Sequence, residues 1–212
     1  MYLSILVLPF LSFLSTNLLG RFIGILGCCI LSTASILTSF VLALCVFFEV
    51  AITGSPCLVT LCNWFQSELF LASWGFYFDS LTASMLLVVA GVSSLVHVYS
   101  TEYLAGDPHQ GRFMGYLSLF TGFMLILVSA DNYIVMFFGW EGIGLASFLL
   151  IGFWYTRIQA GKSAIKAMLV NRVGDLGLAL GISAIFLTFK SVDYLVVFAL
   201  TPNSINETYQ RT

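Results

Sequence analysis

The chain has 212 residues, of which 59% are hydrophobic and 8% are charged, and its formal net charge at pH 7 is −2. Eight basic and ten acidic side chains are too few for the water-facing surface of a soluble domain, which is usually about 25% charged. The composition also excludes a disordered chain and, because it offers no basic patch, a nucleic-acid-binding protein. We therefore expect a protein embedded in the lipid bilayer.

Six predominantly apolar intervals recur along the chain, each with about the 20 residues needed to cross roughly 30 Å of hydrocarbon. In chain order they cover residues 2–20, 22–48, 80–101, 113–130, 132–156 and 161–189. The second interval is uncharged from end to end, whereas the fifth and the sixth carry charged residues near their centres. This pattern predicts an all-α membrane protein with about six transmembrane helices.

Two segments lack this pattern. Residues 51–79 combine Gly54 and Pro56 with several aromatic side chains, which is typical of a turn-rich segment at the membrane interface. Residues 192–200 are apolar but too short to cross the bilayer, and a polar tail follows them. The predicted organisation is two N-terminal transmembrane helices (1–50), an aromatic interfacial loop (51–79), transmembrane helices three to six with the intramembrane charges (80–190), and a short interfacial segment with a polar tail (191–212).

The charges between the predicted helices alternate in sign. Basic residues follow the first, third and fifth helices, at Arg21, at Arg112, and at Arg157 with Lys162. The intervening loops carry only the acidic residues Glu49, Glu68, Asp79 and Asp131. Because loops rich in Lys and Arg remain on the cytoplasmic or matrix side, both termini are expected on the opposite side of the membrane.

The five cysteines do not form a C-x-x-C pair, so a zinc or iron–sulfur site is not expected. Cys57 and Cys62 lie in one predicted loop, and the sequence leaves open whether they pair. His97 and His109 do not form a convincing axial pair for haem. We therefore expect no metal and no cofactor in this chain.

Glu141 lies near the middle of the fifth predicted helix, ten residues or about 15 Å beyond Asp131. A charge at that depth costs about 2.5–3.5 kcal/mol, so this carboxyl group must be protonated or paired with a cation. Its own helix offers no partner one turn away, so we expect compensation from another helix or another chain. Such a residue indicates a proton or ion path, and an acid that only hydrogen-bonds a neighbouring helix is the alternative.

The sixth predicted helix carries three charges. Arg172 and Asp175 are three residues apart and can pair on one face, whereas Lys166 falls on the opposite face. A helix with charges on opposite faces must be packed on both sides or line a hydrated cavity. The alternative is an Arg–Asp pair that holds the helix at a fixed depth while Lys166 extends to the membrane surface.

His97 completes the set of candidates. It lies near the end of the third predicted helix, where a histidine that is only hydrogen-bonded and a member of a proton relay are equally compatible with the sequence. In falling order of expectation, the candidates for a proton path are Glu141, Asp175, Arg172, Lys166 and His97.

Several stretches of the chain have a recognisable motif. Residues 139–150 read GWEGIGLASFLL, residues 166–175 read KAMLVNRVGD, and residues 107–113 read DPHQGRF after SLVHVYS at 94–100. Together they resemble the subunit 5 family of NADH dehydrogenase, the distal antiporter-like subunit of respiratory complex I. The resemblance covers essentially the whole chain, but the family is much longer and contains two inverted repeats of five helices and a lateral helix.

The resemblance implies a role for the candidate residues. In this family, the glutamate that matches Glu141 pairs with a lysine on the seventh helix, and the residues that match Arg172 and Asp175 belong to the surrounding charge network, with His97 near its edge. This chain stops before the seventh helix, so we expect a second chain that carries the missing C-terminal part and docks beside the sixth helix.

The resemblance also implies the setting. We expect a non-redox subunit of a proton-translocating NADH:ubiquinone oxidoreductase in the mitochondrial inner membrane, surrounded by other membrane subunits, with flavin, iron–sulfur clusters and ubiquinone elsewhere in the complex. A bacterial plasma membrane is the less favoured location. Two alternatives remain: part of a Mrp-type cation/proton antiporter or membrane-bound hydrogenase, and a structural membrane subunit whose buried charges are inert.

Overall fold

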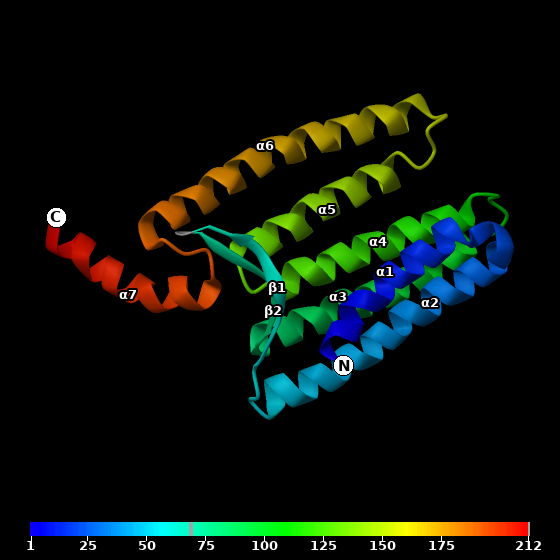
Figure 1. The fold of residues 1–212 in the computed structure, drawn as a ribbon. Helices are drawn as coiled ribbons and strands as arrows, with labels where there is room; N and C mark the ends of the chain where they lie inside the picture. Colours follow the sequence, from blue (N-terminus) through cyan, green and yellow to red (C-terminus); the bar gives the residue numbers. More distant parts are fainter. Residues whose placement is uncertain (68–69, 212) are drawn as a thin grey trace.

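The computed structural model describes the backbone of residues 1–67 and 70–211 and the side chains as far as residue 202. Helices dominate the chain, and one two-stranded sheet interrupts them (Figure 1). The elements are α1 (Tyr2–Leu18), α2 (Gly20–Val46), the π-helical turn η1 (Phe47–Ile52), β1 (Cys57–Gln66), β2 (Leu71–Phe78), α3 (Ser80–Tyr103), α4 (Gln110–Ser129), α5 (Tyr133–Ile151), α6 (Ile158–Phe189) and α7 (Tyr194–Arg211).

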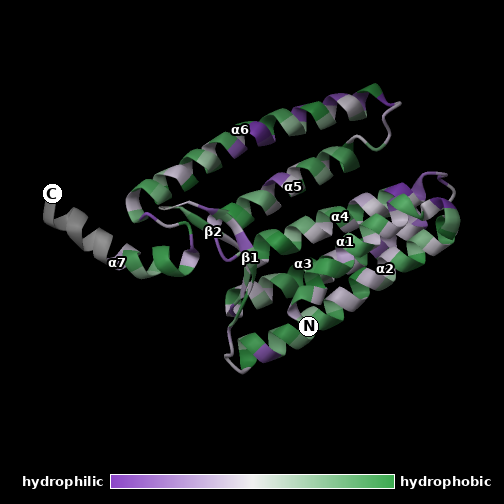
Figure 2. Ribbon diagram, in the orientation of Figure 1, coloured by the Kyte–Doolittle hydropathy of each residue, from purple (hydrophilic) through white to green (hydrophobic). Residues whose placement is uncertain are grey.

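The helical membrane fold predicted from the sequence is confirmed. Within the described residues, five helical segments are long and apolar enough to cross a bilayer, namely α2 with η1, α3, α4, α5 and α6. The remaining apolar helix, α1, is 17 residues long. Most of the helix surfaces are apolar in Figure 2, as is expected for helices that face lipid.

Two side-chain caps set the beginnings of α3 and α5. The Asp79 carboxylate accepts a hydrogen bond of 2.7 Å from the backbone N–H of Thr82. Asn132 is fully buried, and its side-chain oxygen accepts hydrogen bonds from the N–H groups of Ile134 and Val135 at 3.1 and 2.9 Å. These caps satisfy backbone donors that a helix leaves free in its first turn, and they explain why each helix begins directly after a polar residue.

The range 51–79, where the sequence predicts an irregular aromatic loop, contains an antiparallel hairpin. Strands β1 and β2 pair from Cys57 opposite Phe78 to Gln66 opposite Leu71, with two irregularities in register. The strands are rich in β-branched and aromatic residues, which favour a pleated backbone over a loop. Cys57 and Cys62 are five positions apart on the same strand, and both are free thiols.

The helices form a packed group and an outer layer. Helices α1 to α4 contact one another and surround a core that includes Ile5, Leu86 and Leu125 and also takes in Phe78 of β2. Helix α5 packs on α4, and α6 packs on the far side of α5, so α6 is the outermost helix of the layer (Figure 1). The hairpin crosses one end of this assembly, where Trp74 contacts Phe138 of α5 with ring centroids 5.0 Å apart.

The C-terminal segment also differs from the expectation. Residues 194–211 form helix α7 in place of a short interfacial segment and a polar tail. Its start is tied to the α4–α5 loop by two backbone hydrogen bonds, from Tyr133 N–H to the Val192 carbonyl at 3.1 Å and from Tyr194 N–H to the Asp131 carbonyl at 3.2 Å.

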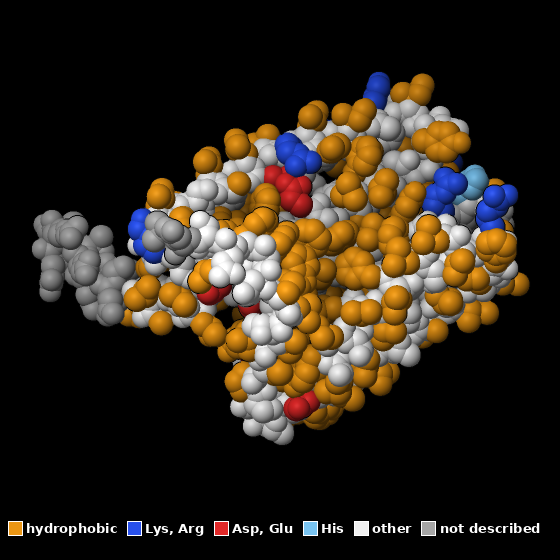
Figure 3. All heavy atoms as spheres, in the orientation of Figure 1, with side chains coloured by type: hydrophobic (Ala, Val, Ile, Leu, Met, Phe, Trp, Pro, Cys, Tyr) orange, Lys and Arg blue, Asp and Glu red, His pale blue; other side chains and the backbone are white. Residues whose placement is uncertain are grey.

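The two ends of the bundle differ in charge as the sequence predicts. The α1–α2 turn and the α3–α4 and α5–α6 loops, which carry the basic residues, lie at one end, whereas the hairpin and both termini lie towards the other (Figure 1). Basic side chains gather at the first end in Figure 3. Glu68, one of the acidic loop residues in the prediction, lies outside the described residues.

Candidate functional site

The two intramembrane acids lie at mid-height on neighbouring helices. Glu141 is eight residues, or about 12 Å, into α5, and ten residues of that helix follow it. Asp175 lies near the centre of the 32-residue helix α6. A Cβ atom on Gly144 would lie 3.7 Å from the Asn171 side chain, which is ordinary van der Waals contact, so α6 does not require a glycine at this position of α5.

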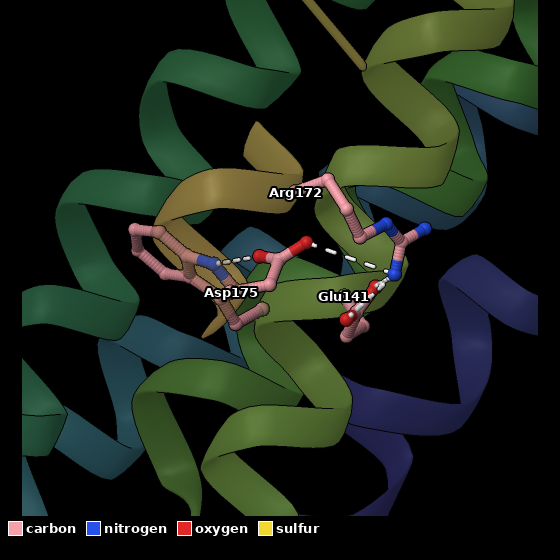
Figure 4. Close-up of polar contacts among 4 residues, drawn as sticks. Glu141, Arg172 and Asp175 are labelled. Atoms are coloured by element: carbon pink, nitrogen blue, oxygen red, sulfur yellow. Dashed lines mark hydrogen bonds and ion pairs between the residues drawn. The ribbon is translucent and has the colours of Figure 1, made fainter. Parts of the chain in front are cut away.

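Arg172 joins the two acids (Figure 4). Its Nη1 atom lies 3.0 Å from Oε1 and 3.1 Å from Oε2 of Glu141, and 3.8 Å from Oδ2 of Asp175. The indole N–H of Trp140 donates a hydrogen bond of 2.8 Å to Oδ1 of Asp175. One guanidinium nitrogen therefore faces two carboxylates, and an indole holds the second carboxylate in place.

This geometry corrects one expectation. The sequence left open whether another helix or another chain compensates Glu141, and in the structure Arg172 reaches it from α6, whereas the resemblance implied a lysine beyond the sixth helix. The spacing of three residues rightly pairs Arg172 with Asp175, but at 3.8 Å this is the longer of the two contacts. The sequence analysis paired Arg172 with an acid on its own helix because residue spacing shows which side chains share a face of one helix. It does not show how α5 and α6 are rotated relative to each other.

The charges of the cluster do not balance. With both acids ionised, Glu141 and Asp175 contribute two negative charges, and Arg172 contributes one positive charge. One cation therefore serves two carboxylates in a medium of low dielectric, where an uncompensated charge is costly.

The cluster opens to the outer side of the α5–α6 layer. The side chain of Arg172 is 61% exposed and that of Glu141 is 32% exposed, whereas that of Asp175 is only 10% exposed. Two pockets, of about 260 and 500 Å³, are both lined by these three residues, and their remaining walls are mostly apolar. Charged side chains exposed at this depth of the membrane would face lipid hydrocarbon, which is energetically unfavourable unless another polar group or water contacts them.

His97 belongs to a different polar cluster. Its imidazole is fully buried; Nδ1 lies 2.8 Å from the Ser93 carbonyl, and Nε2 lies 3.3 Å from the Ser118 hydroxyl. The chain of hydroxyls continues from Ser118 to Ser12 of α1 at 3.1 Å and from Ser93 to Thr121 of α4 at 2.5 Å. The structure therefore places His97 among α1, α3 and α4, and it does not line either of the pockets around Glu141.

Lys166 is also apart from the acids. It lies exposed on α6, forms no ion pair within the described residues, and does not line either pocket around Glu141. Trp140, by contrast, contributes to the site and was missed by the sequence analysis. The available signal was an indole N–H next to an intramembrane acid, since a buried indole N–H usually finds a hydrogen-bond acceptor.

A second pair of acids lies at the hairpin end. Burial raises the pKa of Asp131 to about 6, with a further contribution from the nearby carboxylate of Asp193, and burial also raises the pKa of Asp193. Both acids line a pocket of about 270 Å³ between β1, β2 and the start of α7. Asn132 donates to Asp131 at 2.7 Å, so this pair is part of the structure that joins the loop to the hairpin.

The chain is similar to subunits of respiratory complex I and of Mrp antiporters. Residues 64–114 match the family described as "NADH-Ubiquinone oxidoreductase (complex I), chain 5 N-terminus", and residues 130–210 match "NADH:quinone oxidoreductase/Mrp antiporter, TM". Proteins named NADH-ubiquinone oxidoreductase chain 5 are 55% identical over 98% of this chain in Mycosarcoma maydis, 56% over 95% in Chondrus crispus and 54% over 98% in Triticum aestivum. The chain spans only 30–31% of the length of these relatives.

Two solved structures have a similar fold. A chain of the membrane-bound sulfane sulfur reductase, an archaeal respiratory membrane complex, superposes with a TM-score of 0.80 at 16% identity over 94% of this chain and 40% of that one. A chain of the Mrp complex from a Dietzia species superposes with a TM-score of 0.73 at 25% identity over 91% of this chain and 20% of that one. Both similarities support the first part of an antiporter-like fold.

Proposed function

Because the chain matches the N-terminal part of relatives named NADH-ubiquinone oxidoreductase chain 5, we propose that it forms the corresponding part of a proton-translocating membrane subunit. It contributes to a proton path and holds no redox centre of its own. The observation that carries the proposal is the cluster of Glu141, Arg172 and Asp175, in which one guanidinium serves two carboxylates at mid-membrane.

The unequal charges of the cluster supply a mechanism. When Arg172 neutralises Glu141, Asp175 keeps its hydrogen bond from Trp140 and holds a proton in the proposed cycle. When a second cation approaches Glu141 and frees Arg172 for Asp175, both acids are compensated and a proton held by either is released. Moving one elementary charge across the membrane gains or costs about 2.3 kcal/mol per 100 mV of membrane potential. In this proposal, the position of Arg172 therefore determines whether the cluster holds a proton.

The second cation comes from outside this chain in the proposal. The outer face of α6 exposes a row of apolar side chains beside Arg172, namely Leu169, Val173, Leu176 and Leu180. Because the chain spans about 30% of its relatives, we propose that the remaining part of the subunit covers this face and brings a lysine to Glu141. This contact also closes the two pockets around the cluster.

The proposed setting is an NADH:ubiquinone oxidoreductase of the mitochondrial inner membrane, in which flavin, iron–sulfur clusters and ubiquinone belong to other subunits. The membership of such a complex is supported by the names of the relatives. The proposal puts the basic end of the bundle on the matrix side and both termini on the intermembrane-space side, and the gathering of Lys and Arg at that end supports it.

The decisive experiment replaces Glu141 with Gln in the assembled complex. We expect the rate of proton transfer through this site to fall about 100-fold or more. A side chain that transfers a proton contributes a factor of about 10²–10⁴ to the rate of that step. The measurement is the number of protons moved per NADH oxidised in sealed vesicles. The matched control is Glu102→Gln, an exposed acid at the end of α3 that forms no ion pair within the described residues.

Two results decide between the alternatives. An unchanged proton-to-electron ratio in Glu141→Gln favours a structural subunit with inert charges. A cation-dependent proton exchange without NADH oxidation favours a Mrp-type antiporter, the second candidate, which is supported by the TM-score of 0.73 to a chain of the Mrp complex. Co-purification of the chain with flavin and iron–sulfur subunits separates the first candidate from the second.

A further inference from the structure

A second pocket with charged walls lies at the basic end of the bundle, away from Glu141. It has a volume of about 240 Å³ and forms where the end of α1 meets the starts of α2 and α4. Its polar walls include Arg21, Arg112, His109 and Asn17, and Ile25 lies on its apolar side. We infer that this pocket binds the phosphate group of an anionic phospholipid.

The backbone is shaped to bring the two arginines together. Gly24 has φ +76° and ψ 169°, so α2 is broken after its first turn and Arg21 lies on a separate turn that closes the end of the bundle. Cys28 forms the floor between the two helix starts. A Cβ atom on Gly20 would lie 3.5 Å from its Sγ, and one on Gly111 would lie 3.4 Å from its Cβ, so larger side chains at these positions would narrow the pocket.

The positive charge of the pocket has no counter-charge of its own. Within the described part of the chain, the ion pairs are those of Arg172, and neither Arg21 nor Arg112 takes part in one. Asp107 is the acid closest along the chain to His109, but its carboxylate accepts from the His109 backbone N–H at 2.9 Å and from the Trp154 indole at 3.4 Å. Guanidinium groups are the side chains best suited to bind phosphate oxygens, and two that take part in no ion pair within the described residues line this pocket.

The apolar surface around the pocket favours a lipid over a soluble phosphate as the ligand. The pocket lies at the level where the basic loops end and the apolar helices begin, and Phe22 and Leu26 beside it are largely exposed. Figure 3 shows basic side chains and a histidine together at this end of the molecule. Basic pockets between helix ends on the matrix or cytoplasmic side bind anionic headgroups, and the adjacent apolar surface accommodates the acyl chains.

The test uses the purified membrane complex that contains this chain, reconstituted in nanodiscs of phosphatidylcholine with a small fraction of phosphatidylglycerol. Phosphatidylglycerol bound per complex is measured by native mass spectrometry. We expect the double variant Arg21→Gln/Arg112→Gln to bind it about tenfold more weakly, and Arg21→Lys/Arg112→Lys to keep most of the binding. The control is Arg157→Gln, a basic residue at the same end that stacks on Trp154 and does not line the pocket.

Three outcomes would overturn the inference. In the first, the double glutamine variant binds phosphatidylglycerol as well as the unchanged complex does. In the second, Arg157→Gln weakens binding by the same factor as the double variant, which would indicate an unspecific basic surface. In the third, inorganic phosphate displaces phosphatidylglycerol completely at millimolar concentration, which would indicate a site for a soluble anion. If the double variant fails to assemble, Asn17→Leu and Arg112→Gln as single variants serve the same test.

Discussion

The two polar clusters of this chain are built in opposite ways. His97 is fully buried and hydrogen-bonds Ser93 of α3 and Ser118 of α4, and Ser118 in turn hydrogen-bonds Ser12 of α1. Around Glu141, the single cation serves two acids, and the arginine side chain is 61% exposed. The first cluster satisfies its polar groups within the chain, whereas the second is left with excess negative charge and an open side.

The difference follows from packing. Helix α4 is enclosed by α1, α3 and α5, so its hydroxyl groups meet partners on several sides. Helix α6 packs on α5, and its buried residues within the described part are confined to one stripe, Ala164, Asp175 and Ile182. A polar group on an enclosed helix is therefore satisfied by its neighbours, whereas the arginine on the outermost helix stays largely exposed.

The largest expected effect concerns the two faces of α5. A Cβ atom on Gly139 would lie 2.8 Å from the backbone of Leu127 on α4, whereas one on Gly144, facing α6, would lie 3.7 Å from Asn171. We expect Gly139→Ala to lower the free energy of unfolding by about 1–3 kcal/mol, because the backbone of α4 must move. Gly144→Ala should be neutral or slightly stabilising, since Ala favours a helix over Gly.

The measurement is unfolding of the chain in detergent micelles by increasing concentrations of sodium dodecyl sulfate, followed by circular dichroism. Equal destabilisation by the two substitutions would mean that α5 is packed as tightly against α6 as against α4. The proposed contrast between a closed and an open side of the bundle would then be wrong.

An intermediate effect is expected in the closed cluster. Replacing His97 with Leu removes the imidazole contacts to Ser93 and Ser118, and each net hydrogen bond contributes about 0.5–1.5 kcal/mol to stability. We expect a loss of about 1 kcal/mol in the same unfolding assay, and a smaller loss for His97→Gln, which keeps a donor and an acceptor. If the Leu variant keeps full stability but lowers proton translocation in the complex, His97 acts as a relay and its structural role is minor.

The smallest effect in the chain alone concerns the ion pair of Glu141 and Arg172. Because both side chains are partly exposed, a double-mutant cycle with Glu141→Gln and Arg172→Gln should give a coupling energy of about 0.2–1 kcal/mol in micelles. In the assembled complex the same cycle should give a larger coupling, since a neighbour that covers α6 removes water from the pair. Identical coupling energies in the two settings would contradict the proposal that the remaining part of the subunit covers this face.

Several features followed from the sequence without knowledge of the tertiary structure. The apolar intervals predicted helices α1 to α6, and the position of Glu141 along α5 follows from counting residues. The pair of Arg172 and Asp175 follows from a spacing of three on one helix. The opposite charge of the two bundle ends also follows, since it depends only on which residues separate the helices.

Other features were missed because they depend on contacts between segments. The hairpin forms because two aromatic segments pair along their length, and composition alone suggested a loop. Helix α7 begins where the Asp131 carbonyl accepts a hydrogen bond from the Tyr194 N–H, a contact between loops that lie far apart in the chain.

The sequence by itself determined that this chain crosses a membrane, and that acids and an arginine lie at the centre of its fifth and sixth helices, because hydrophobic length and helical rise are local properties. Only the tertiary structure decided which charges meet. The relative rotation and distance of α5 and α6 place Arg172 against Glu141. His97 of α3 faces α4 and hydrogen-bonds Ser118, so it lies away from that site. Side-chain pairing across helices depends on packing, and packing is set by all the helices together.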